Sequence, residues 1–144
     1  MSPPLRPLAS FSIIFDTNVL VSAFVFRGKA KDIYHYCAER HTIFTTDWLL
    51  DELQDVLSRE KFRLPVLLQR EILDQIRSDS QLVHPYNDLP TASIDPDDNY
   101  VLQAALFVDA SFLITGDTRH LLPLKKVGNT DIISPTNFHE RFIW

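Results

Sequence analysis

Short apolar segments alternate with longer amphipathic segments along this chain, and this alternation limits the folds that it can adopt. Residues 12–15 and 111–115 are the clearest short segments, with the apolar, partly β-branched composition of buried strands. Further strands are predicted at residues 42–45, 81–84 and 131–134. Strands that are separated by helices favour a parallel sheet covered on both faces. We therefore predict an α/β fold, a single three-layer α/β/α domain with a parallel central sheet.

The longer segments carry apolar residues at helical spacing. Helices are predicted at residues 19–26, 31–40, 47–58, 66–78 and 97–108, and a C-terminal helix begins at Pro135. Asn18 or Thr17 is the expected N-cap of the first helix, and Thr46 or Asp47 is that of the third. Pro96 occupies the first helical position of the fifth, where a proline is favoured.

The size and composition of the chain bound its class. It has 144 residues, 45% of them hydrophobic, which suits one domain with a buried core. The longest apolar run, residues 104–108, is far shorter than the ~20 residues of a spanning helix, so no membrane partner is expected. The proline-rich start lacks the apolar core of a signal peptide. We expect a cytoplasmic protein with a flexible N-terminal extension at residues 1–10 and a domain at residues 11–144.

Charge and cysteine content exclude other classes. The chain has 14 Lys and Arg residues against 19 Asp and Glu residues, a net charge of -5, so bulk electrostatics do not attract nucleic acid. A nucleic-acid function therefore requires a local basic patch and a way to neutralise the acids. The lone Cys37 excludes an internal disulfide and a multi-thiolate zinc site.

Four acids stand out by their position relative to the predicted elements: Asp16, Glu52, Asp98 and Asp117. Asp16 and Asp117 closely follow predicted strands, and the carboxyl ends of parallel strands are where such sheets gather ligands. Two carboxylates about 4 Å apart repel by about 4 kcal/mol at an effective dielectric of 20, so a cluster of four requires a divalent cation. Oxygen ligands favour Mg²⁺ or Mn²⁺ over zinc.

Ordinary structural roles are the alternative for two of these acids. Asp98 lies at a helix start, where the helix dipole favours an acid, and Asp95 or Asp97 can fill the same role. Glu52 lies beside Asp51 on an amphipathic helix, where solvated acids are common. Neither residue, taken alone, indicates a site.

Taken together, four motifs resemble the PIN-domain nucleases. They are Phe15-Asp16-Thr17-Asn18-Val19-Leu20, Asp51-Glu52-Leu53, Asp95-Pro96-Asp97-Asp98-Asn99 and Thr115-Gly116-Asp117. They occur in the family's order from about residue 11 to residue 142. Any one motif is weak, whereas all four at these spacings are fairly specific. Within the family, the chain is most similar to the bacterial VapC-like toxin components of toxin–antitoxin systems.

The resemblance implies a set of catalytic metal ligands: Asp16, Glu52, Asp98 and Asp117. Thr17, Asn18 and Thr115 match polar positions that support these acids, although helix capping or a strand end also accounts for them. Asp98 is preferred to Asp97 because the pattern Asp-x-x-Val-Leu-x-Ala-Ala begins at Asp98.

One position departs from the family pattern. Related sequences often carry another acid after the Thr-Gly-Asp motif, where this chain has Arg119 and His120. The number of ligands, and whether one or two ions bind, therefore stays open. His120 is interpreted either as a phosphate contact or as a surface histidine.

The reaction that the resemblance implies is hydrolysis of RNA phosphodiester bonds with Mg²⁺ or Mn²⁺. Arg27, Lys29 and Arg119 are the candidate phosphate-binding residues, with a solvated surface as the alternative. The implied partners are an RNA substrate, an antitoxin protein and a second copy of the chain. The apolar faces of the helices at residues 31–40 and 46–58 offer a candidate surface for association, or else belong to the core.

Two alternatives to a toxin stay open, a PIN-type nuclease without an antitoxin and a receiver-like domain, whereas a phosphatase lacks its general acid. A PIN-type nuclease in RNA processing has the same site and no antitoxin. A phosphatase of the haloacid-dehalogenase kind requires Asp-x-Asp after the first strand, where this chain has Asp16 and Asn18. A receiver-like phosphoacceptor domain, a signalling module, requires an acidic pair near the first strand and an aspartate at the end of the third, and neither is found.

Overall fold

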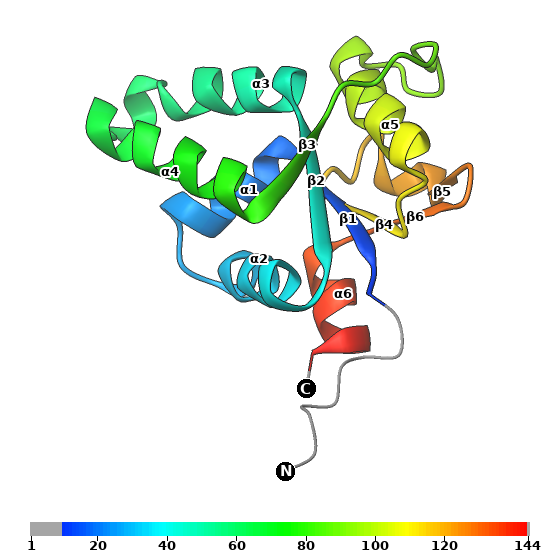
Figure 1. The fold of residues 1–144 in the computed structure, drawn as a ribbon, viewed down its shortest axis with the longest axis horizontal. Helices are drawn as coiled ribbons and strands as arrows, with labels where there is room; N and C mark the ends of the chain where they lie inside the picture. Colours follow the sequence, from blue (N-terminus) through cyan, green and yellow to red (C-terminus); the bar gives the residue numbers. More distant parts are fainter. Residues whose placement is uncertain (1–9, 144) are drawn as a thin grey trace.

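The central sheet has six strands in the order β3-β2-β1-β4-β6-β5 (Figure 1). The computed structural model describes residues 10–143. The strands are β1 (Ser12–Phe15), β2 (Thr42–Thr46), β3 (Ser80–Val83), β4 (Phe112–Ile114), β5 (Lys126–Val127) and β6 (Thr130–Ile133). The pairs β1–β2, β1–β4, β2–β3 and β4–β6 are parallel, whereas β5 pairs antiparallel with β6. The five strands expected from the sequence are therefore present.

Helices connect the parallel strands from β1 to β4, and α6 follows β6. They are α1 (Thr17–Val25), α2 (Lys29–Arg40), α3 (Asp47–Leu57), α4 (Val66–Asp79), α5 (Pro96–Val108) and α6 (Pro135–Phe142), with short 3-10 turns at Glu60–Phe62 and Leu122–Leu124. Pro96 and Pro135 occupy the first turns of α5 and α6, where a proline costs no hydrogen bond. No described helix is long and apolar enough to cross a membrane.

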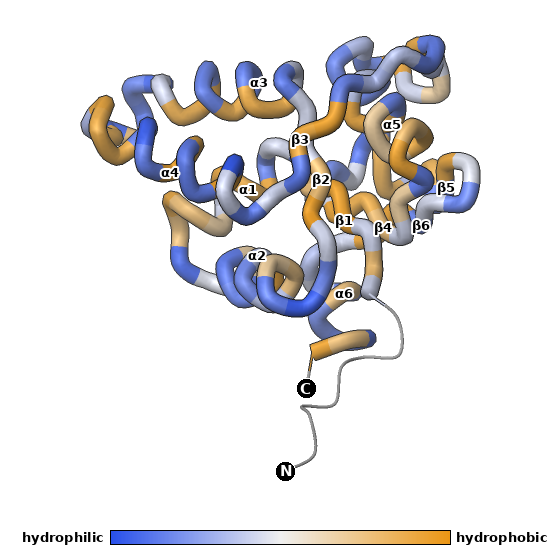
Figure 2. Tube along the Cα trace, viewed as in Figure 1, coloured by the Kyte–Doolittle hydropathy of each residue, from blue (hydrophilic) through white to orange (hydrophobic). Residues whose placement is uncertain are grey.

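Two hydrophobic clusters lie on opposite faces of the sheet. Side chains alternate along β1, so Ile13 and Phe15 pack with α1, α2 and α6, and Ile14 packs with α5. Helix α3 contributes to both, with Leu50 in the first cluster and Leu49 in the second. The central strands are accordingly among the most hydrophobic parts of the chain (Figure 2). This arrangement confirms the predicted three-layer α/β/α fold.

Strand register brings distant polar residues to one edge. Phe15 on β1 aligns with Ile114 on β4, and the Asp16 amide donates to the Ile114 carbonyl at 3.0 Å. The residues that follow these two strands, Asp16 and Thr115, therefore lie side by side at the carboxyl edge of the sheet. Residues that are 99 positions apart in the sequence come into contact here.

The first two helices begin earlier than predicted. Asp16, rather than Thr17 or Asn18, is the N-cap of α1, because its carboxylate accepts the Thr17 amide. Helix α2 begins at Lys29, directly after Gly28, whose φ of 145° lies in the region that favours glycine. Thr46, one of the two residues expected to cap the third helix, does cap α3 through the Leu49 amide.

The short strand β5 was not predicted. It forms a hairpin with β6 through Gly128 and Asn129, and Gly128 adopts a φ of 54°. A Cβ at Gly128 would lie 2.7 Å from the Leu106 side chain on α5, so the hairpin packs too closely there for a larger residue. The two-residue length of β5 gives no period to detect in the sequence.

Of the two interpretations of the apolar faces of α2 and α3, association surface or core, the structure supports the core. The apolar residues of α2 and α3 are core, namely Ile33, Tyr34, Cys37, Leu49, Leu50, Leu53, Val56 and Leu57. Amphipathic periodicity identifies a buried face but not what buries it, and here the sheet and neighbouring helices do. The flexible extension predicted at residues 1–10 lies, except for exposed Ser10, outside the described residues.

Candidate metal-binding active site

Asp16 lies at the centre of the carboxyl edge, between β1 and α1. The residue is 7% exposed. Its Oδ1 accepts the Thr17 amide at 2.8 Å, and its Oδ2 accepts the Thr115 hydroxyl at 2.8 Å. Burial raises the pKa of Asp16, the two hydrogen bonds lower it, and repulsion from Asp117 and Asp95 adds to the rise. The net pKa is raised, so the ionised form of this carboxyl is destabilised.

Asp117 is held by the turn that follows β4. The Thr115 hydroxyl accepts the Asp117 amide at 3.0 Å. The Asp117 Oδ1 accepts the amides of Arg119 and His120 at 2.9 and 3.2 Å, and Oδ2 accepts the Leu121 amide at 3.3 Å. Burial raises the pKa of Asp117, but these three amides outweigh it and the net pKa is lowered. Asp117 is therefore the acid whose charge the backbone stabilises best.

Glu52 reaches the edge from α3. The Thr17 hydroxyl donates to Glu52 Oε2 at 2.9 Å, which ties the second turn of α3 to the first residue of α1. Burial raises the pKa of Glu52, the Thr17 hydrogen bond lowers it, and the charges of Asp16, Asp97 and Asp98 raise it further. The Thr17 hydroxyl thus orients the Glu52 carboxylate.

Asp98 is positioned by two hydrogen bonds between Ser93 and Asn99 at the start of α5, and this pair of residues forms a bracket next to Asp98. The Asn99 side chain accepts the Ser93 amide at 2.9 Å and donates to the Ser93 carbonyl at 3.2 Å. This fixes the Ser93 hydroxyl, which donates to Asp98 Oδ2 at 3.1 Å. Burial raises the pKa of Asp98 to about 6, and repulsion from Asp117, Asp95 and Asp16 adds to that effect. Asp98 therefore faces the other acids, whereas Asp97 is exposed.

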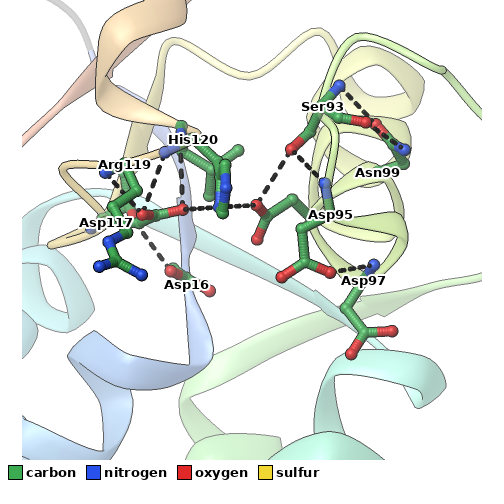
Figure 3. Close-up of polar contacts among 11 residues, drawn as sticks. Asp16, Ser93, Asp95, Asp97, Asn99, Asp117, Arg119 and His120 are labelled. Atoms are coloured by element: carbon green, nitrogen blue, oxygen red, sulfur yellow. Dashed lines mark hydrogen bonds and ion pairs between the residues drawn. The ribbon is translucent and has the colours of Figure 1, made fainter.

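His120 lies between Asp117, in the turn after β4, and the acidic residues at the start of α5 (Figure 3). Its Nδ1 is 3.6 Å from Asp98 Oδ2 and 3.8 Å from Asp117 Oδ2. Ligand atoms of His120, Asp98 and Asp95 all lie within 4.8 Å of one another. The Nδ1 atom of His120 thus lies close both to the carboxylate of Asp98 on α5 and to that of Asp117 in the turn after β4.

The donor set fits a hard divalent cation. The carboxylates of Asp16, Glu52, Asp98 and Asp117 repel one another. Within residues 10–143, no lysine or arginine lies within ion-pair distance of these four carboxylates. A cluster of carboxylate oxygens without a basic counter-ion has the chemistry that Mg²⁺ or Mn²⁺ complements.

The other expected residues lie around this cluster. Asn18 is exposed and lines a pocket of about 280 Å³ with Val19, Ser22, Ala30, Gly116 and Pro135. Arg119 is exposed in the turn that holds Asp117, and Arg27 and Lys29 are exposed on either side of Gly28. Thr115 is fully buried and links Asp16 to Asp117.

Sequence reasoning missed the residues that position Asp98. Ser93 and Asn99 form the bracket, and Asp95 caps α5 by accepting the Asp97 amide at 3.0 Å. The signal for Asp95 was present, as an acid directly before a proline at a helix start. The mutual hydrogen bonds of Ser93 and Asn99 depend on a loop conformation that no short pattern encodes.

The fold and this edge define an α/β protein with a carboxylate-lined site at the ends of its parallel strands. The chain belongs to the PIN domain family, whose model matches residues 12–119. Members of this family are nucleases, so the chain belongs to a class of hydrolases. No curated protein has significant similarity to the chain.

Several chains of solved structures match this one. One is VapBC2 from Rickettsia felis, crystallised bound to a DNA fragment from its promoter. The match has a TM-score of 0.60 and 18% identity, and it covers 85% of this chain and 98% of that chain. At this identity the similarity shows a common fold.

Proposed function

We propose that the chain is a metal-dependent endoribonuclease and the toxin of a toxin–antitoxin pair. The observation that carries the nuclease proposal is the convergence of four carboxylates, without a lysine or arginine counter-ion among the described residues, at the carboxyl edge of a PIN domain. Asp16, Glu52, Asp98 and Asp117 are the proposed catalytic and metal-binding residues. Thr17 and Thr115 hold Glu52 and Asp16 through hydrogen bonds.

A bound Mg²⁺ or Mn²⁺ supplies Lewis-acid polarisation of a phosphoryl oxygen and lowers the pKa of a water molecule. The residues of the chain orient the carboxylates. Thr17 fixes Glu52, Thr115 fixes Asp16 relative to Asp117, and Ser93 fixes Asp98. These hydrogen bonds preorganise the acids before substrate arrives, which reduces the cost of reorganisation during the reaction.

We infer that RNA approaches over the turn that contains Arg119. Its side chain is exposed, and its amide already donates to Asp117. Arg27 and Lys29 flank Gly28, and Lys29 directly precedes Ala30, which lines the pocket with Asn18 and Gly116. These basic groups provide a local attraction for phosphate that the net charge of -5 does not.

The toxin proposal draws on the family and on one solved structure. The structure with the common fold is VapBC2 on promoter DNA, and an antitoxin partner and a homodimer follow for this chain as proposals. Exposed apolar side chains at the end of α1 and the start of α4, Phe26, Val66 and Leu67, offer a surface for either. We propose a cytoplasmic location for the chain and for its antitoxin. The chain can be purified from cells that also express the genes next to its own. If no partner protein is purified with it, that result favours the alternative of an RNA-processing nuclease without an antitoxin.

The test is cleavage of single-stranded RNA with Mg²⁺, with Mn²⁺ and with EDTA, beside DNA of the same sequence. We expect internal cleavage of RNA with either ion, none with EDTA and none by Asp16→Asn. Asp51→Asn is the matched control because Asp51 is exposed and lies beside Glu52. Cleavage in EDTA, or full activity of Asp16→Asn, would contradict the proposal, and cleavage of DNA alone would correct its substrate.

A further inference from the structure

The position of the His120 side chain is not explained by hydrogen bonds of its ring nitrogens. Its backbone amide donates to Asp117 Oδ1 at 3.2 Å, and its neighbour Leu121 is fully buried, so the turn fixes the Cα of His120. The imidazole then extends toward Asp98. Among the described residues, no hydrogen bond includes a ring nitrogen of His120.

The distances favour a shared ion over a direct contact. Nδ1 is 3.6 Å from Asp98 Oδ2 and 3.8 Å from Asp117 Oδ2, and both exceed the length of a good hydrogen bond, about 2.7–3.2 Å. Two ligands that are each ~2.1 Å from one ion lie roughly 3–4.2 Å apart. The distance from Nδ1 to each of these two carboxylate oxygens is therefore the distance expected between two ligands of one cation.

We propose that His120 Nδ1 is a ligand of the metal ion that Asp98 and Asp117 bind, so that the site of this chain contains nitrogen as well as oxygen. The proposal rests on the metal site of the proposed function. The competing role for His120 is that of a positive counter-charge that occupies the position of the ion in its absence.

A nitrogen ligand changes which ion the site prefers. Mg²⁺ takes oxygen ligands and retains water, whereas imidazole is a good ligand for first-row transition ions. We therefore expect Mn²⁺ to bind more tightly than Mg²⁺ in the wild-type chain. His120→Gln should lower the affinity for Mn²⁺ by about tenfold or more and the affinity for Mg²⁺ by less.

The experiment is pulsed EPR of Mn²⁺ bound to the full chain. Electron spin echo modulation from a directly bound ¹⁴N is expected in the wild-type protein, and it should change to the ¹⁵N pattern when histidine is ¹⁵N-labelled. This comparison uses the wild-type chain alone, so it does not depend on the folding of a variant. Calorimetric titration with Mn²⁺ and Mg²⁺ then compares wild type with His120→Gln.

The matched control is His84→Gln. His84 forms a similar pair, with Nδ1 3.5 Å from Asp47 Oδ2, outside the acidic cluster. It should retain both the nitrogen modulation and the Mn²⁺ affinity of wild type, whereas His120→Gln should lose them.

The outcomes separate this proposal from the one that supports it. Mn²⁺ binding without nitrogen modulation, or equal or tighter Mn²⁺ binding by His120→Gln, overturns the ligand role and supports the counter-charge. An absence of any Mn²⁺ or Mg²⁺ binding to the wild-type chain overturns the metal site itself, and the ligand role with it.

Discussion

At the residue scale, Asp16 has two roles that conflict in the absence of a cation. It caps α1 and accepts the Thr115 hydroxyl, and both contacts stabilise the fold. It is also a buried carboxyl among other acids, with a raised pKa, so its negative charge opposes folding. Asparagine retains the oxygen that caps α1 and removes the charge, and its NH₂ group donates to the Thr115 hydroxyl oxygen in place of the bond that Asp16 Oδ2 accepts.

Asp16→Asn is expected to raise the melting temperature of the metal-free protein while abolishing cleavage. Removal of a buried charge worth about 1 kcal/mol corresponds to about 3–5 °C in a domain of this size. Differential scanning calorimetry in EDTA measures the change, with Asp51→Asn as the control of unchanged stability. A lower melting temperature for Asp16→Asn would mean that its contacts are mainly structural.

Asp98 makes the stability of the metal-free protein depend on pH. Its pKa is about 6 in the folded chain and about 3.9 when unfolded, so the folded state binds more protons between these values. Its contribution is complete below about pH 4 and is lost as the pH rises through 6. The free energy of unfolding in EDTA should fall by about 2 kcal/mol between pH 4.5 and 7.

Urea denaturation at several pH values measures this dependence. Asp98→Asn should flatten the profile, whereas Asp88→Asn, in an exposed loop, should leave it unchanged. Saturating Mn²⁺ should reverse the slope because a divalent ion binds the ionised carboxylate. A metal-free stability that rises over this interval would contradict the assigned direction.

At the element scale, an aromatic pair sets the position of α3 relative to α5. The Trp48 and Tyr100 rings stack with centroids 4.5 Å apart and an interplanar angle of 10°. Trp48 lies one helical turn before Glu52, and Tyr100 lies two residues after Asp98. The stack therefore holds together the two helices that carry these acids.

Trp48→Ala is expected to lower the free energy of unfolding by about 1–2 kcal/mol, because the stacking contribution and some buried area are lost. It should also weaken Mn²⁺ binding, since Glu52 and Asp98 are then less well positioned. Trp48→Phe should retain most of both properties. Wild-type stability in Trp48→Ala, measured by chemical denaturation, would show that the stack does not couple the helices.

At the scale of the whole molecule, large apolar side chains are exposed at the end of α1 and at the start of α4. Phe26 is 54% exposed and its ring contacts Phe62, and in the first turn of α4 Val66 and Leu67 are 62% and 73% exposed. Such side chains lose water contact when a second chain covers them, and the stabilisation is offset by the cost of association.

The chain is expected to be a homodimer through this surface. Light scattering at micromolar concentration should report about twice the 16.6 kDa of one chain, and Leu67→Glu should shift it toward the monomer. Gln75→Glu, on the same helix, is the control for added charge. A 16.6 kDa particle for the wild-type chain would reject the homodimer.

The sequence by itself determined the layers and much of the acidic edge. The apolar alternation predicted the strands and helices, because period 2 and period 3.6 are local properties of the chain. Asp16 and Asp117 were identifiable because each follows a buried strand. The resemblance to PIN domains added Glu52 and Asp98, which no local pattern distinguishes from surface acids.

Only the tertiary structure decided which side chains meet. The strand order places β4 beside β1, so Thr115 contacts Asp16 across 99 positions of sequence. The bracket of Ser93 and Asn99 directs Asp98 toward His120. The buried faces of α2 and α3, and the hairpin of β5 with β6, depend in the same way on packing partners far along the chain. Such contacts arise from the packing of whole elements, so no local period or propensity encodes them.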